Sequence, residues 1–106
     1  MGEKSIFDLI ALWHHDRNLI EGATDKDQFA KLIQEAGELS VSICKQRSPK
    51  DDIGDMIVVL TNIAERHGLT IEECAEHAYN EIKIVVVRWL MECLSRKIVT
   101  IEPQHL

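Results

Sequence analysis

Two acidic pairs, Glu35-Ala36-Gly37-Glu38 and Asp52-Ile53-Gly54-Asp55, decide how this chain folds. In each pair the acids stand three residues apart, which places both on one face of a helix. A helix stop and a helix start lie between the pairs, so two adjacent antiparallel helices would aim four carboxylates at one point. Four like charges repel each other, and carboxylate oxygens favour a hard cation such as Mg²⁺ or Mn²⁺ between them.

Each acidic pair also has a simpler explanation. A single Glu-x-x-Glu is most often a solvated helix face, and acids in a first helical turn, such as Asp52, stabilise the helix dipole. Glu35 and Glu38, however, border an apolar face. Asp55 lies one turn further in, directly before the apolar run 56–60, and Asp is a poor residue for a helix interior. These positions favour a site over a solvated surface.

The whole chain has helical periodicity, and its glycines and prolines fall mainly between the periodic segments. The pattern predicts helices over 5–20, 25–46 and 48–67 and a fourth that starts at residue 70. The expected N-caps are Thr24, Ser48 (with Pro49 in the first helical position) and Thr70, and Gly68 is the expected stop of the third helix. From Arg96 onward we expect a short extended tail, and Pro103 should end any regular structure.

Length and composition restrict the class of protein. A chain of 106 residues is a single domain, here 1–106, and its net charge of −6 argues against nucleic-acid binding. The longest apolar run, 56–60, is too short to span a membrane, and no secretory leader is visible. The three cysteines have no zinc-ligand spacing and are expected to be reduced thiols. We therefore expect a cytoplasmic protein.

The predicted helices are long for so small a chain. The helix over 25–46 would extend about 33 Å, and the helix over 48–67 contains a run that is apolar on every side. Helices of this kind need more covering surface than one chain supplies. We therefore expect an all-α, four-helix bundle-like subunit whose core is shared across an obligate homo-oligomer, either a dimer or a dimer of dimers.

Beyond the acidic pairs, an ordered set of motifs resembles the MazG-type all-α nucleoside triphosphate pyrophosphohydrolases, especially their small phage-like members. The resemblance covers 6–83. It is carried by these stretches: Trp13-His14-His15-Asp16-Arg17-Asn18-Leu19, Gly22-Ala23-Thr24, Gln28-Phe29-Ala30-Lys31-Leu32-Ile33-Gln34-Glu35-Ala36-Gly37-Glu38-Leu39, Asp52-Ile53-Gly54-Asp55-Met56 and Ala78-Tyr79-Asn80-Glu81-Ile82-Lys83.

The chain departs from that family's pattern in two places. The family has Glu-x-x-Asp as its second acidic pair, whereas this chain has Asp52, which is one methylene shorter, in the first position. After Lys83 the family continues with basic residues, a glycine turn and a short Gly-Val-Phe-like strand, whereas 84–106 reads differently. A one-base shift in the coding sequence would explain this second departure.

The resemblance implies hydrolysis of a nucleoside triphosphate to the monophosphate and pyrophosphate, with deoxynucleotides as the expected substrates, Mg²⁺ as cofactor and Mn²⁺ as a substitute. Such an enzyme clears or trims the nucleotide pool. The implied metal ligands are Glu35, Glu38, Asp55 and, less directly, Asp52. In the alternative assignment, one of these acids, such as Glu38, accepts the proton of the attacking water.

Six further residues are candidates for substrate contacts. Lys31 lies one turn before Glu35 and either contacts phosphate or pairs with that acid. Trp13 either stacks on a base or is a core residue. Asn80 and Lys83 match positions that face the nucleotide in the resembled family, and their alternative is a solvated helix face. Hydrogen bonds from Asn18 and Gln28 to base or sugar are implied by the resemblance alone. His14 and His15 are adjacent and point apart, so surface positions are expected for both.

Two other classes of protein compete with this interpretation. A helical di-iron carboxylate protein uses Glu-x-x-His pairs, and the only one here, Glu102 to His105, falls in the proline-containing tail. A non-catalytic helical interaction module could keep the acidic metal site without turnover. Dependence of thermal stability on divalent metal, lost in Glu38→Gln, separates the enzyme from the module.

Overall fold

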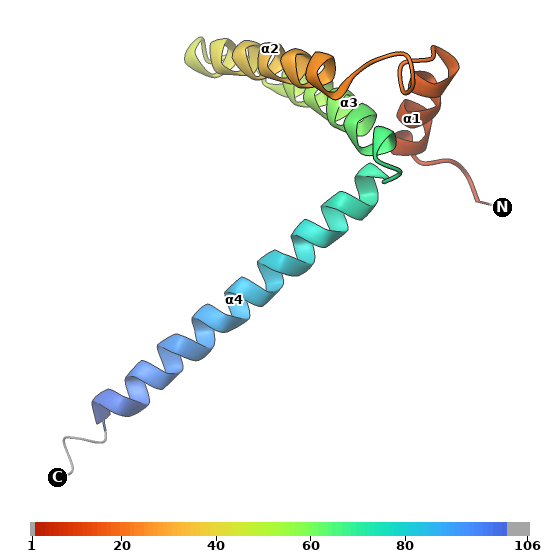
Figure 1. Ribbon diagram of the computed structural model, residues 1–106. Helices are drawn as coiled ribbons and strands as arrows, with labels where there is room; N and C mark the ends of the chain where they lie inside the picture. The colour runs from red at the N-terminus through yellow and green to blue at the C-terminus, as the bar shows by residue number, and fades with distance from the viewer. Residues whose placement is uncertain (1, 102–106) are drawn as a thin grey trace. The chain divides into compact units, whose positions relative to one another are not determined.

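The computed structural model describes residues 2–101, with side chains described through Lys97, and within that range it contains four helices and no strand (Figure 1). The chain divides into two compact units, Met1–Cys74 and Ala75–Leu106. The first unit contains α1, α2, α3 and the first turn of α4, and the second contains the rest of α4. The predicted all-α class is confirmed.

Helix α1 (Ile6–Asp16) begins with a capping box, in which Ser5 Oγ accepts from the Asp8 N–H and Asp8 accepts from the Ser5 N–H. The helix ends four residues before the predicted end. Asn18 adopts a left-handed φ of 56°, and the Leu19 N–H then donates to the carbonyl of His14 at 2.9 Å. Asn is one of the few side chains that accept this conformation, so it stops the helix as a glycine would.

Helix α2 (Asp25–Cys44) begins at the predicted cap, where Thr24 Oγ1 accepts from the Asp27 N–H at 3.1 Å. It ends two residues before the predicted end. Gln46 has a φ of 56°, and the Arg47 N–H closes the end by donating to the carbonyl of Ser42 at 2.8 Å. A left-handed glutamine gives no sequence signal, which is why this end was placed too late.

Helix α3 (Lys50–Arg66) begins differently from the prediction. Its N-cap is Pro49, which has no side-chain capping bond, and Ser48 Oγ accepts only from the Lys50 N–H at 3.3 Å. The predicted N-cap at Ser48, with Pro49 in the first helical position, is therefore wrong, because the helix starts one residue later. The far end is as predicted: Gly68 has a φ of 72° and terminates the helix.

Both α1 and α2 pack against α3, which forms the centre of the first unit. The buried side chains of α3 are Val59, Ala64, Thr61, Asn62 and Asp52. The prediction of burial on several faces holds for α3 as a whole, although Leu60 in the apolar run remains 38% exposed. Among the described residues only Val59 and Ala64 are buried apolar side chains, so the core within one chain is small.

Helix α4 (Ile71–Ile101) begins with the predicted capping box, since Thr70 Oγ1 accepts from the Glu73 N–H and Glu73 accepts from the Thr70 N–H. The predicted extended tail from Arg96 is wrong, because the helix continues to Ile101. No proline or glycine occurs between Gly68 and Pro103, and Pro103 itself lies outside the described residues.

Two further observations concern the whole described range. The cysteines Cys44, Cys74 and Cys93 are free, as predicted. None of the helices described here combines the length and the apolar character that crossing a membrane requires.

Candidate metal centre

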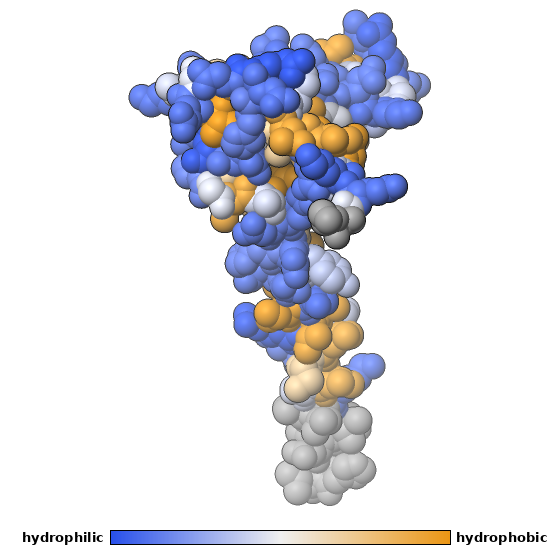
Figure 2. Space-filling model, turned by 90° about the vertical axis from the view of Figure 1, so that its right-hand side faces the viewer, coloured by the Kyte–Doolittle hydropathy of each residue, from blue (hydrophilic) through white to orange (hydrophobic). Residues whose placement is uncertain are grey.

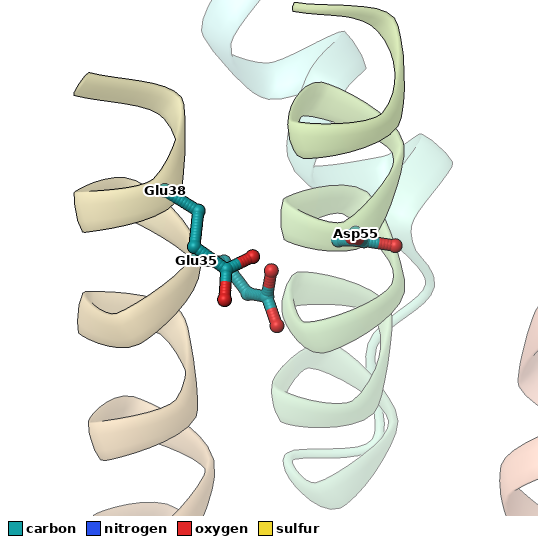
Figure 3. Close-up of side chains that lie close together, drawn as sticks. All are labelled: Glu35, Glu38 and Asp55. Atoms are coloured by element: carbon teal, nitrogen blue, oxygen red, sulfur yellow. The ribbon is translucent and has the colours of Figure 1, made fainter. Parts of the chain in front are cut away.

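Three of the four predicted carboxylates meet where α2 lies against α3. Glu35 and Glu38 extend from α2 toward α3, which carries Asp55 (Figure 3). One carboxylate oxygen from each of the three residues lies within 4.8 Å of the others. The three-residue spacing within α2 places its two acids on one face, and the packing of α2 on α3 supplies the third.

Glu35 is the buried member of this cluster, with 5% of its surface exposed. Its Oε1 pairs with Lys31 Nζ at 3.3 Å, one turn earlier on α2. Its Oε2 is buried and has no hydrogen-bond donor. A buried carboxylate oxygen without a donor is costly, so this atom indicates a place for a proton or a cation.

The arrangement of the acids raises the pKa of Glu38. The side-chain hydrogen bond with Glu35 raises the pKa of Glu38, and the negative charge of Glu35, partial burial and the charge of Asp52 add to the effect, while Lys31 opposes it. The carboxyls of Glu35 and Glu38 can therefore share a proton when no cation is bound. When both are ionised, Glu35 Oε2 has no partner, and a cation would replace the proton.

Asp52 is the fourth predicted ligand, and it lies outside the three-oxygen cluster. It is buried at the start of α3, one turn before Asp55, and its charge reaches Glu38. Its charge still contributes to a strongly negative site.

The donor set suits a hard divalent cation. All the available atoms are carboxylate oxygens, which Mg²⁺ and Mn²⁺ prefer over the softer nitrogen and sulfur ligands. Glu38 and Asp55 are exposed, so a cation held with Glu35 would keep an open side toward solvent. Mg²⁺ usually retains several waters, and a site with few protein ligands accommodates them.

A second polar cluster, which the sequence analysis did not predict, joins α1 to α3. His14, expected at the surface, is only 3% exposed, and its Nε2 lies 2.8 Å from the carbonyl oxygen of Val58. Because that oxygen can only accept, Nε2 carries the hydrogen, and Nδ1 accepts from the Asn62 amide at 3.2 Å. The same amide donates to the carbonyl of Leu19 at 3.0 Å, which anchors the segment after α1. Asn62 is fully buried, and the signal available in the sequence was its position seven residues after Asp55, on the same face of the helix.

His15, in contrast, is exposed as predicted, and its Nε2 lies 2.9 Å from Glu65 Oε1. Trp13 is not a core residue within this chain, since 45% of its surface is exposed. Arg17 lies over its ring at 4.3 Å. Together with Leu9, Ile10 and Val58, Trp13 lines an apolar cavity of about 310 Å³ between α1 and α3.

The remaining candidates for substrate contacts are spread along the chain. Asn18 is exposed in the turn after α1, and Gln28 is half-buried in the first turns of α2. Asn80 and Lys83 are exposed on α4 in the second unit, where Lys83 Nζ lies 4.9 Å from the ring centroid of Tyr79. Contact of any of these residues with a substrate stays a prediction.

Comparison with known proteins gives one curated relative. The chain is 42% identical over 60 residues to an uncharacterised 18.2 kDa protein in the rep–hol intergenic region of Haemophilus phage HP1. The aligned segment covers 55% of this chain and 37% of the relative, so this chain spans little more than a third of that protein. No protein-family model matches the sequence, and no solved structure matches it.

Proposed function

We propose that this protein is a Mg²⁺-dependent nucleoside triphosphate pyrophosphohydrolase, which converts a nucleoside or deoxynucleoside triphosphate to the monophosphate and pyrophosphate. The observation that carries the proposal is the convergence of three carboxylate oxygens within 4.8 Å around the buried, unpartnered Oε2 of Glu35. The ordered motifs shared with the MazG-type family support the same reaction class. Mn²⁺ is the expected substitute.

The charges make the cation necessary for this reaction. A nucleoside triphosphate carries about four negative charges, and the site adds those of Glu35, Glu38, Asp55 and Asp52, so substrate and site repel each other without a counter-ion. Glu35, Glu38 and Asp55 would hold the ion, and Asp52 would contribute through charge or through a bound water. When bound, Mg²⁺ polarises the phosphoryl group and lowers the pKa of a coordinated water.

The side chains of the cluster would have different roles. Glu35 is buried and held by Lys31, so it is suited to a fixed ligand. Glu38 is exposed and has a raised pKa, which suits a carboxylate that accepts the proton of the attacking water. Lys31 is exposed at its end and lies one turn away, so it can also contact a phosphate oxygen.

The rest of the substrate site is proposed from the resemblance. Trp13 would stack on the base, Asn18 and Gln28 would donate hydrogen bonds to base or sugar, and Asn80 and Lys83 would face the phosphates. A homo-oligomer would bring together the parts contributed by different helices. The proposed role is control of the nucleotide pool, often called house-cleaning.

A non-catalytic interaction module is the second candidate, and the apolar surface of α4 favours it. Trp89 and Val85 of that helix are 58% and 59% exposed. Apolar exposure on this scale marks interaction surfaces. Such a module would turn over no nucleotide, and none of its properties would depend on divalent metal.

The test incubates the purified chain with Mg²⁺ and each ribo- and deoxynucleoside triphosphate and resolves the products by ion-exchange chromatography. Monophosphate plus pyrophosphate, abolished by chelator and by Asp55→Asn, is the expected result. Asp51→Asn is the matched control, because Asp51 is a neighbouring exposed acid of α3 outside the cluster. Diphosphate plus phosphate would contradict the proposed bond, and absence of turnover by protein shown to be folded and oligomeric would favour the interaction module.

A further inference from the structure

The second unit consists of a helix whose apolar side chains are exposed. Along α4 the exposed large apolar residues are Tyr79, Ile82, Ile84, Val85, Val86, Val87, Trp89, Leu90, Met91 and Leu94. Figure 2 shows apolar side chains grouped along this helix on the face in view. A helix of this composition is stable in water only when another surface covers it.

One stripe of this surface has the spacing of a helix-pairing seam. Ala75, Ala78, Ile82, Val85 and Trp89 follow each other at intervals of three, four, three and four residues. This alternation keeps one narrow face toward a partner helix. The side chains differ in size along the seam, with two alanines at its start and a tryptophan at its end.

The charges along the helix are segregated as well. The part before residue 83 carries Glu72, Glu73, Glu76 and Glu81, whereas the part from 83 to 97 is mainly basic. Beside the seam, Glu81 and Arg88 occupy equivalent flanking positions seven residues apart. In a parallel pair of α4 helices, the acidic part of one helix would lie beside the acidic part of the other. In an antiparallel pair, the acidic part of each helix lies beside the basic part of its partner.

We propose that α4 pairs antiparallel with α4 of a second copy of this chain. If the two-fold axis of the pair lies between residues 83 and 84, Ile82 packs against the partner's Val85 and Ala78 packs against the partner's Trp89. Each tryptophan then meets a small alanine, so the layers fit by size. Glu81 lies beside the partner's Arg88, and symmetry provides this ion pair twice. The inference does not rest on nucleotide hydrolysis.

Self-association of the full-length protein tests the pairing first. Sedimentation equilibrium should show a dimer or a multiple of it, and V85E should abolish association through α4. E81R and R88E should each weaken the dimer about tenfold, because each creates two like-charge contacts, and the double variant E81R/R88E should recover most of the affinity. Circular dichroism of every variant checks that the helices remain folded. Glu76→Arg is the matched control, because Glu76 lies on α4 away from the seam and from Arg88.

The native cysteines report the direction of the pairing. In the antiparallel arrangement Cys74 lies level with the partner's Cys93, whereas in a parallel pair like cysteines lie level. A C44S protein treated with a short bis-maleimide linker, digested and mapped by mass spectrometry, should yield peptides that join position 74 to position 93 between chains. Mixing isotopically light and heavy protein identifies the links as intermolecular.

Other occupants of the α4 surface give different results, and each would overturn the inference. A monomer at all concentrations means that the helix is covered within its own chain. Links that join position 93 to position 93 mean a parallel pair. A dimer insensitive to V85E and to both charge reversals means that the interface lies elsewhere. A monomer that binds phosphatidylglycerol vesicles means that a lipid surface covers the helix.

Discussion

The amide of Asn62 lies 3.2 Å from Nδ1 of His14 and joins the centre of α3 to α1. Asn62 is fully buried, and the same amide also holds the Leu19 carbonyl. Two segments that are remote in the sequence thus depend on one side chain.

Replacing Asn62 should therefore destabilise the first unit strongly. Asn62→Ala removes both hydrogen bonds and leaves His14 and the Leu19 carbonyl without their donor. We expect a loss of about 2–4 kcal/mol in the free energy of unfolding, measured by urea denaturation. Asn80→Ala, on the exposed surface of α4, is the control and should change the free energy by less than about 0.5 kcal/mol. An Asn62→Ala protein as stable as the wild type would contradict the role of this link.

Neutralising one acid of the metal centre should have different effects on the thermal stability of the metal-free and of the metal-bound protein. Glu38→Gln removes a charge that repels Glu35 and Asp52, so the metal-free variant should melt at a higher temperature than the metal-free wild type. The rise in Tm produced by Mg²⁺ should shrink to less than about half, because the variant has lost one ligand. Differential scanning calorimetry at matched Mg²⁺ concentrations measures both effects. Glu76→Gln, an exposed acid on α4, should leave both unchanged.

The raised pKa of Glu38 also predicts a dependence on pH without metal. Its ordinary value is 4.5, and the folded protein holds this proton more tightly than the unfolded chain does. The stability that this proton supplies is therefore complete below pH 4.5 and is lost as the pH rises through the folded pKa. We expect the difference in Tm between wild type and Glu38→Gln to widen as the pH rises through that window. A constant difference in chelator-treated samples would contradict the shared proton.

Asp25 predicts the opposite dependence at lower pH. It accepts hydrogen bonds from Arg66 and His67, each at 2.8 Å, and these bonds lower the pKa of Asp25 below its ordinary value of 3.8. Its contribution to stability is present at neutral pH and is lost as the pH falls through the folded pKa. Arg66→Ala also removes the hydrogen bond to the Ile20 carbonyl and should cost about 1–2 kcal/mol. The part of this loss that comes from Asp25 should diminish as the pH falls below 3.8 and through the folded pKa of Asp25, as measured by acid titration of circular dichroism.

The unusual α4 sequence leads to a prediction about the gene. The only codon for Met is ATG, and every Glu codon begins with GA. In the frame offset by one base, the last base of the Met91 codon and the first two bases of the Glu92 codon therefore read GGA, which encodes glycine. The next codons of that frame, set by the bases of 92–94, allow valine and then phenylalanine. We expect sequencing across codon 83 to show basic residues followed by Gly-Val-Phe in that frame. A stop codon there would refute the expectation. The acidic centre lies before this point and is unaffected.

Much of the first unit follows from local signals in the sequence. The caps at Thr24 and Thr70, the stop at Gly68 and the meeting of Glu35, Glu38 and Asp55 are all predicted by spacing. These features depend on neighbours within a few residues and on one helix contact. The ends set by left-handed Asn18 and Gln46 were missed, because neither residue type specifies that backbone conformation reliably.

Other features depend on contacts that spacing does not encode. The burial of His14 requires α1 to be placed on α3, and the position of Asp52 outside the group of three oxygens depends on how α2 and α3 pack. The helix also continues beyond Arg96, where the sequence analysis predicted an extended tail, because no glycine or proline interrupts 96–101.

The central place of α3 has a consequence for the order of folding. The short segment 45–49 joins α2 to α3, whereas α1 reaches α3 only through contacts more than 40 positions away in the chain, such as that of His14 with Val58. Short loops close at lower entropic cost, so the α2–α3 hairpin should form early and α1 should dock last. Amide hydrogen exchange should then reveal a partly open state in which α1 has come away while the three acids remain assembled.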